Sequence, residues 1–220
     1  MIDMRAEGQS GFTLMEIMIA ILILGTVLTT VYAAYTGTLR IVKETQHADE
    51  TYDMARMTLK LMTEDLASVQ SCRGVFIFHS LSSDIADADF TELAFLSSSH
   101  LDFDNGTQSG NAMIHYYVKE IEPGSHALFR KDTLFRWEEE KTFEREGGYM
   151  VCDRLESLAF LFYGSDGEEY ETWDSDENRE QEKNKAPAVV RIDLAFTGPG
   201  EEVEPYRFRT GVYIPMMGGK

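Results

Sequence analysis

A single carboxylate stands at the start of the most apolar stretch of this sequence. Glu16 is followed by Ile17 to Leu39, about 23 residues without a charge. A carboxylate beside such a run is costly in a membrane, and it persists where it has a partner or a role. Glu16 is therefore the first residue to which we assign chemistry.

The residues just before Glu16 supply a partner for it. Gly11 and Phe12 form an abrupt junction between a short polar leader and the apolar run, which indicates a cleavage site between them. Cleavage there creates an α-amine on Phe12 and makes Glu16 the fifth residue of the processed chain. An ion pair is much stronger in a low-dielectric helix bundle than in water. We therefore expect amine and carboxylate of neighbouring subunits to pair and to set the axial register.

The apolar run has the length of a membrane helix. At 1.5 Å per residue, about 23 residues span the ~30 Å hydrocarbon core of a bilayer. An ordinary signal anchor and a secretory signal peptide cut after Ala33 are the alternatives, but neither explains Glu16. We predict a leader over residues 1–11, a transmembrane and assembly helix over 12–39, and a folded domain over 40–220.

The helical pattern continues beyond the apolar run. Apolar residues recur at alternating steps of four and three from Ile41 to Val69, which predicts an amphipathic helix over about 40–72 that ends before Gly74. Charged residues, Asp65 among them, are assigned to a solvated face. Several stripe residues are Thr, Ala or Tyr, which suit packing on a sheet better than a coiled-coil seam.

The remainder of the chain predicts a sheet. Short runs rich in Val, Ile, Phe and Tyr alternate with polar residues, which is typical of half-buried antiparallel strands. These runs are 75–79, 93–97, 112–119, 127–137, 158–163, 189–196 and 206–214. A long N-terminal helix packed on antiparallel β-sheet is an α+β fold.

Charge and cysteine content narrow the functional classes. With 20 basic against 38 acidic residues, a formal charge of −18, the chain is a poor partner for nucleic acid, which is bound through Lys and Arg. Cys72 and Cys152 are the two cysteines, too few for a disulfide scaffold. They could pair in an oxidising compartment or stay as two buried thiols, and the sequence leaves both open.

The sequence offers no catalytic constellation. It lacks a phosphate-binding glycine loop, a zinc-protease motif, a nucleophile elbow and a Cys-x-x-Cys pair. Ser97 to Ser99 precede His100, but a catalytic triad is assembled by tertiary geometry, so we interpret them as a polar loop. We predict that the protein is not an enzyme and needs no cofactor.

One acidic segment has the beginning of a calcium loop. Its oxygen ligands at alternate positions are Asp174, Asp176, Asn178 and Glu180. Arg179 stands where an EF-hand requires glycine, and Lys185 stands where it requires the bidentate glutamate. A solvated acidic loop is therefore the preferred interpretation, and an irregular calcium site is the weaker one.

The N-terminal residues resemble a known family. The sequence Gly-Phe-Thr-Leu-Met-Glu over residues 11–16, ahead of an apolar run, is similar to the signal of type IV pilins and type II secretion pseudopilins. The resemblance implies a pilin-like fold, cleavage after Gly11 and methylation of Phe12 by a prepilin peptidase. It also implies one pass through the bacterial inner membrane and a C-terminal domain in the periplasm. The leader departs from the usual basic pattern, because Arg5 is set against Asp3 and Glu7.

Short stretches of the folded domain resemble one branch of that family, the minor pseudopilin J (GspJ) of type II secretion. These stretches are 57–66, 93–98, 128–130, 155–158 and 188–194. This resemblance implies a structural tip subunit that initiates pseudopilus assembly with I-type and K-type minor pseudopilins and contacts other pseudopilins. A minor pilin of a type IV pilus or competence system is the alternative. An anchored periplasmic enzyme or binding domain is a less favoured one.

Overall fold

The computed structural model describes residues 11–83, 85, 90–100, 110–137, 143–177, 182–198 and 204–215, without the side chain of Glu44. The chain divides into two compact units, Met1–Ala48 and Asp49–Lys220. The first unit holds the apolar part of the long helix, and the second holds its last turns and the sheet.

Helix α1 runs from Leu14 to Ala67, 54 residues without a break, which confirms the predicted continuous helix. Gly25 and Gly37 are accommodated inside it. Threonine hydroxyls in the apolar part each donate a hydrogen bond to a carbonyl one turn earlier, so they need no partner from a lipid environment. These threonines are Thr26, Thr29, Thr30, Thr36 and Thr38.

The helix ends at Ala67, about five residues before its predicted end near residue 72. Groups of another segment form hydrogen bonds with the carbonyl oxygens at its C-terminal end. The Ser97 hydroxyl lies 3.1 Å from the carbonyl oxygens of both Asp65 and Ser68. The amide of Gln70 then donates to the carbonyl of Leu96 at 3.3 Å. The chain therefore leaves the helix directly alongside a strand.

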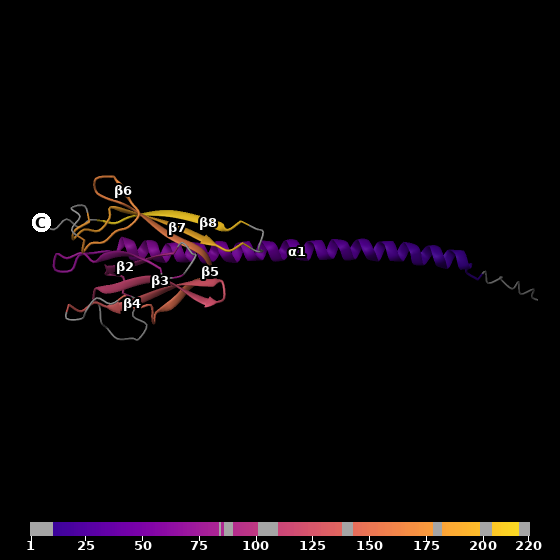
Figure 1. Ribbon diagram of the computed structural model, residues 1–220. Coiled ribbons are helices and arrows are strands. Elements are labelled where there is room, and N and C mark those ends of the chain that lie inside the picture. The colour runs from indigo at the N-terminus through magenta and orange to yellow at the C-terminus, as the bar shows by residue number, and fades with distance from the viewer. Residues whose placement is uncertain are drawn as a thin grey trace, which may run out of the picture. The chain divides into compact units, whose positions relative to one another are not determined.

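The described strands form one antiparallel sheet of eight strands in the order β1-β2-β3-β4-β5-β7-β8, with β6 paired to β5 (Figure 1). Seven strand regions were predicted; β7 has the predicted bounds, and β2 and β8 nearly have them. β5 begins nine residues before its predicted start at residue 158, and β6 was not predicted. The strands are β1 (Phe78–Ser82), β2 (Thr91–Ser97), β3 (Ala112–Glu122), β4 (Ser125–Leu134), β5 (Tyr149–Tyr163), β6 (Glu169–Tyr170), β7 (Val189–Phe196) and β8 (Tyr206–Tyr213).

The early start of β5 depends on Gly148. Its φ is +79°, and a Cβ atom there would lie 2.4 Å from the carbonyl oxygen of Arg130 on β4. Only glycine permits this close approach of two backbones. Farther along β5, Arg154 has a φ of 55° and the register shifts between Leu155 and Ser157. The strand thus pairs first with β4 and then with β7.

The core of the second unit lies between α1 and the inner face of the sheet. Buried helix residues at helical spacing are Thr51, Ala55, Thr58, Met62 and Leu66. The predicted stripe was partly wrong, since Ile41 is 65% and Tyr52 is 56% exposed.

Tyr52 nonetheless contacts Phe208 on β8, with ring centroids 5.2 Å apart. Asp65, near the helix end, contacts Tyr116 on β3 and Arg130 on β4. Contacts with both halves of the strand order show that the sheet curls around this part of the helix, as Figure 1 shows.

The disulfide considered between Cys72 and Cys152 is not present. Both thiols are free, Cys72 partly buried in the turn after α1 and Cys152 buried in β5. Burial raises the pKa of the Cys152 thiol to about 12, because the thiolate is poorly solvated there. The reactive thiolate form of Cys152 is therefore rare near neutral pH.

The two thiols should differ in reactivity. In the detergent-solubilised chain at pH 8, a maleimide should label Cys72 rapidly and Cys152 only after unfolding, read out by intact mass. The Cys72→Ser variant should take up almost no label while folded. Equal labelling of both thiols in the folded chain would contradict the burial of Cys152.

Candidate functional site

The first turn of α1 holds Glu16 through a capping box. The Thr13 amide donates to Glu16 Oε2 at 2.9 Å, and the Thr13 hydroxyl donates to the same oxygen at 3.0 Å. In return, the Glu16 amide donates to the Thr13 hydroxyl oxygen at 3.3 Å. Thr13 and Glu16 thus satisfy amides that a helix start leaves without partners.

The capping box assigns Thr13 a role that the sequence analysis missed. Its signal is present in the sequence, since Thr followed three residues later by Glu is the pattern of a helix start. Among the described residues both Thr13 bonds go to Oε2, which leaves Oε1 for a donor outside the cap. Phe12, directly before the cap, is 85% exposed. The pairing of Glu16 with a Phe12 amine stays a prediction.

The apolar side chains that follow Glu16 point outward. Ile21, Leu24 and Leu28 are each more than half exposed, as are others along the segment. In the part of the chain that the structure describes, α1 is the one helix whose length and composition would allow it to cross a membrane.

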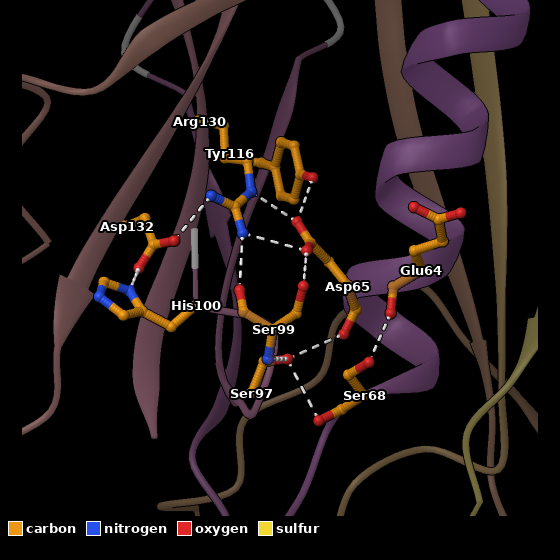
Figure 2. Close-up of polar contacts among 9 residues, drawn as sticks. All are labelled: Glu64, Asp65, Ser68, Ser97, Ser99, His100, Tyr116, Arg130 and Asp132. Atoms are coloured by element: carbon orange, nitrogen blue, oxygen red, sulfur yellow. Dashed lines mark hydrogen bonds and ion pairs between the residues drawn. The ribbon is translucent and has the colours of Figure 1, made fainter. Parts of the chain in front are cut away.

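A second polar group lies near the opposite end of α1, and its central pair is fully buried (Figure 2). Asp65 and Arg130 both have side chains with 0% exposure. The guanidinium donates from Nε to Asp65 Oδ2 at 2.6 Å and from a terminal nitrogen to Oδ1 at 3.0 Å. Tyr116 donates its hydroxyl to Oδ2 at 2.5 Å, and Ser99 donates to Oδ1 at 2.7 Å. Each carboxylate oxygen of Asp65 therefore accepts two hydrogen bonds.

Arg130 makes further contacts that complete the group. It donates to Asp132 Oδ2 at 2.9 Å and to the carbonyl of Ser99 at 3.0 Å. Asp132 in turn lies 2.7 Å from Nδ1 of His100 (Figure 2). One guanidinium thus joins two carboxylates, those of Asp65 and Asp132, in one hydrogen-bonded network.

The network holds its members in fixed charge states. Burial acts to lower the pKa of Arg130, but hydrogen bonds and the charge of Asp65 outweigh it, so the pKa is raised and the guanidinium stays charged. Burial first, and then the charge of Asp65, raises the pKa of Tyr116 well above its usual value. Tyr116 is therefore a neutral donor.

One sequence interpretation is wrong here. Asp65 was assigned to a solvated face, but it lies three residues after Met62 and one before Leu66, within the buried stripe. The interpretation of Ser97–His100 as a polar loop is confirmed for residues 98–100, which lie outside the strands, whereas Ser97 is the buried last residue of β2 and bonds to the end of α1. The Ser99 hydroxyl faces Asp65 and the His100 ring faces Asp132, so the two are turned to different partners.

The structure describes only two of the four predicted calcium ligands. Asn178 and Glu180 lie outside the described residues. Asp174 and Asp176 are described, and they lie beside His79 of β1, which the sequence analysis did not connect with them. Nδ1 of His79 is 2.9 Å from Asp174 Oδ1, and its Nε2 is 3.7 Å from Asp176 Oδ2.

Among the comparisons with known proteins, the match to a family model covers only the N-terminus of the chain. Residues 8–32 match the family model described as the prokaryotic N-terminal methylation motif. No curated protein is significantly similar to the chain. A type IV-like pilin from Thermus thermophilus is similar in structure, with a TM-score of 0.45 and 11% identity over 76% of this chain and 97% of that chain. The chain thus carries an N-terminal methylation motif, with Gly11, Phe12 and Glu16 inside the matched segment.

Removing one partner of the buried ion pair should be strongly destabilising. We expect Arg130→Met to lower the free energy of unfolding by about 3–5 kcal/mol, because Asp65 is left charged and buried. The double variant Asp65→Leu/Arg130→Met should recover only part of that loss, because Asp132 and Tyr116 then lack their bonds to these two side chains. Urea unfolding of the detergent-solubilised chain, followed by tryptophan fluorescence, measures both.

The matched control is Arg56→Met. Arg56 is 81% exposed and its pair with Asp53 is long, at 3.9 Å. Exposed pairs contribute little, so this variant should unfold as the parent does. If Arg130→Met were as mild as Arg56→Met, the stabilising role of the network would be refuted.

Proposed function

We propose that the protein is a minor pseudopilin of a type II secretion system, of the J type, that helps to initiate pseudopilus assembly. The observation that carries the proposal is the methylation motif over residues 8–32, with its carboxylate at Glu16 ahead of an apolar helix. The short stretches that resemble the J-type branch favour this subunit over other members of the family.

In this proposal the chain is processed before it assembles. A prepilin peptidase removes residues 1–11 and methylates the new amine of Phe12. Residues 12–39 then stay in the inner membrane as a single pass, and residues 40–220 form the periplasmic domain. The exposed apolar side chains of α1 meet lipid before assembly and the helices of other pseudopilins after it.

The capping box gives Glu16 a defined state before assembly. Thr13 holds one carboxylate oxygen, which fixes the side chain beside the helix start and keeps the charge partly satisfied. The other oxygen is then available to the ammonium of Phe12 in a neighbouring subunit. Because that contact forms in a low-dielectric bundle, it favours one axial register over others.

Within this function the protein does no chemistry of its own. The I-type and K-type minor pseudopilins are its proposed partners at the tip, and the acidic folded domain faces the periplasm. The alternative, a minor pilin of a type IV pilus or competence system, is favoured by the same motif, because both classes of subunit share it.

Loss of the Glu16 charge should impair assembly without impairing processing. We expect Glu16→Leu and Glu16→Gln to be cleaved after Gly11 and methylated on Phe12, verified by mass spectrometry of the N-terminal peptide. Both should enter filaments at least about tenfold less than the parent, because the ammonium of a neighbour lacks its partner. Filament incorporation is measured by quantitative blotting of sheared filaments.

The control variant Thr13→Ala separates capping from pairing. It removes the hydroxyl of the cap but keeps the carboxylate, so it should weaken the helix start by only about 1 kcal/mol and leave incorporation close to normal. Normal incorporation of Glu16→Leu would refute the register role. An N-terminus other than methylated Phe12 in the parent would refute the pseudopilin proposal itself.

The choice of subunit class is tested by association. The full chain, co-expressed with I-type and K-type minor pseudopilins from the same secretion system and extracted in mild detergent, should co-purify with both in one complex by size-exclusion chromatography. Co-purification with minor pilins of a type IV pilus instead would assign it to that system. The Arg130→Met variant, which destabilises the folded domain, is expected to reduce the yield of the complex.

A further inference from the structure

In the described part of the second unit, two buried ring nitrogens, Nδ1 of His115 and Nε2 of His79, have no hydrogen-bond partner, and the latter lies beside acidic side chains. His79 follows the core residue Phe78 in β1, and its side chain is only 7% exposed. Its Nε2 makes no hydrogen bond with any described residue. Burying a ring nitrogen without a partner is unfavourable, so such an atom calls for an explanation.

A segment distant in sequence is fixed beside this ring. The Ser80 amide donates to the carbonyl of Trp173 at 2.8 Å, and the Ser175 amide donates to the carbonyl of Phe78 at 3.0 Å. Trp173 is 1% exposed and anchors the segment in the core. These bonds set Asp174 directly opposite His79.

The carboxylates near His79 are held by bonds of their own. Asp174 Oδ1 lies 2.9 Å from Nδ1 of His79 and accepts the Asp176 amide at 2.8 Å. The Asp174 amide donates to Glu182 at 2.9 Å, and Glu182 is itself 1% exposed. Asp176 Oδ2 lies 3.7 Å from Nε2, too far for a hydrogen bond.

The spacing suits an ion between these groups. One donor atom each from His79, Asp174 and Asp176 lies within 4.8 Å of the other two. An ion bound at about 2.0–2.2 Å from a nitrogen and an oxygen fits between atoms that are 3.7 Å apart. The Asp174 and Asp176 side chains are 43% and 54% exposed, so the ion can enter from solvent.

We propose that His79, Asp174 and Asp176 form a site for one divalent transition-metal ion of the zinc type. Nδ1 carries its proton toward Asp174, which directs the lone pair of Nε2 to the ion, as second-sphere carboxylates commonly do for histidine ligands. Asp176 is the second ligand, and water completes the coordination.

The ligand atoms of this site differ from those of the calcium loop considered in the sequence analysis, because they include an imidazole nitrogen. Calcium takes oxygen ligands almost exclusively, whereas imidazole suits zinc, copper, iron and nickel. A neutral imidazole with two carboxylates also balances the charge of a divalent cation. The buried nitrogen therefore identifies the class of metal, and no ligand outside the described residues is needed.

The bound ion would stabilise the contact between β1 and the segment around Asp174. Since β1 is one end of the described strand order, the segment around Asp174 is what lies along its outer side. The site is independent of the proposed assembly function, because it involves neither Glu16 nor the membrane helix.

The test is zinc binding by the untagged full chain in detergent, after treatment with a chelator. Isothermal titration with ZnCl₂ should show one ion per chain, and zinc should raise the midpoint of thermal unfolding. His79→Gln and Asp176→Asn should each weaken zinc binding at least about tenfold. Asp176→Asn is nearly isosteric at a half-exposed position, so it should fold as the parent does without metal.

The control variants are His126→Gln and Asp153→Asn, which change an imidazole and a carboxylate elsewhere in the sheet. Asp153 matches Asp174 in exposure, at 43%. Both should bind zinc as the parent does. Substitution with Co²⁺ should give visible bands of nitrogen and oxygen ligation without thiolate charge transfer, which excludes binding at Cys72.

Three results would overturn the proposal. They are the absence of stoichiometric zinc binding, zinc binding that is unchanged in both His79→Gln and Asp176→Asn, and Ca²⁺ binding at these residues that is tighter than zinc binding. None of these results bears on whether the chain is processed at Gly11 or assembles through Glu16.

Discussion

The buried ion pair between Asp65 and Arg130 is the interaction on which the folded domain depends. A charge without a partner costs several kcal/mol in a protein interior, so the two groups are tolerated only together. Tyr116 and Ser99 occupy the remaining positions around the carboxylate. Because the guanidinium fork has one orientation, rotating α1 or sliding it by one turn would leave charges unpaired. The ion pair thus favours the observed packing of helix on sheet over such shifted ones.

The carboxylates at the two ends of α1 differ in burial and in the number of hydrogen bonds that they accept. Asp65 accepts two hydrogen bonds on each oxygen and is fully enclosed. Glu16 is exposed, and its described partners occupy one oxygen through the Thr13 cap. A saturated carboxylate is a structural element, and a half-satisfied one is suited to a contact with another chain. The last turns of α1 belong to the folded domain, and the first turns carry the carboxylate that we propose for contacts between subunits.

The sheet both packs against the last turns of α1 and carries Arg130, the partner of Asp65. Thr51, Ala55 and Met62 of the helix are buried against its inner face, and β5 passes from pairing with β4 to pairing with β7 at the register shift after Leu155. Gly148 lets β5 begin close against β4 at Arg130, the residue whose guanidinium pairs with Asp65. On the β1 side, the segment around Asp174 is joined to the edge by backbone hydrogen bonds. Edges of this kind are commonly covered, since an open strand invites pairing with other chains.

The sequence by itself determined the features that depend on near neighbours. Helix α1, the junction at Gly11 and the bounds of β7 follow from an apolar run, a change in residue type and an alternation of two, all of which act over a few residues. The first half of β5 could not be predicted, because charged residues and a register shift interrupt its alternation. The partners of Asp65 and of His79 were also beyond reach. Arg130 is 65 residues from Asp65, and only strand register and the packing of α1 bring such distant groups to hydrogen-bonding distance.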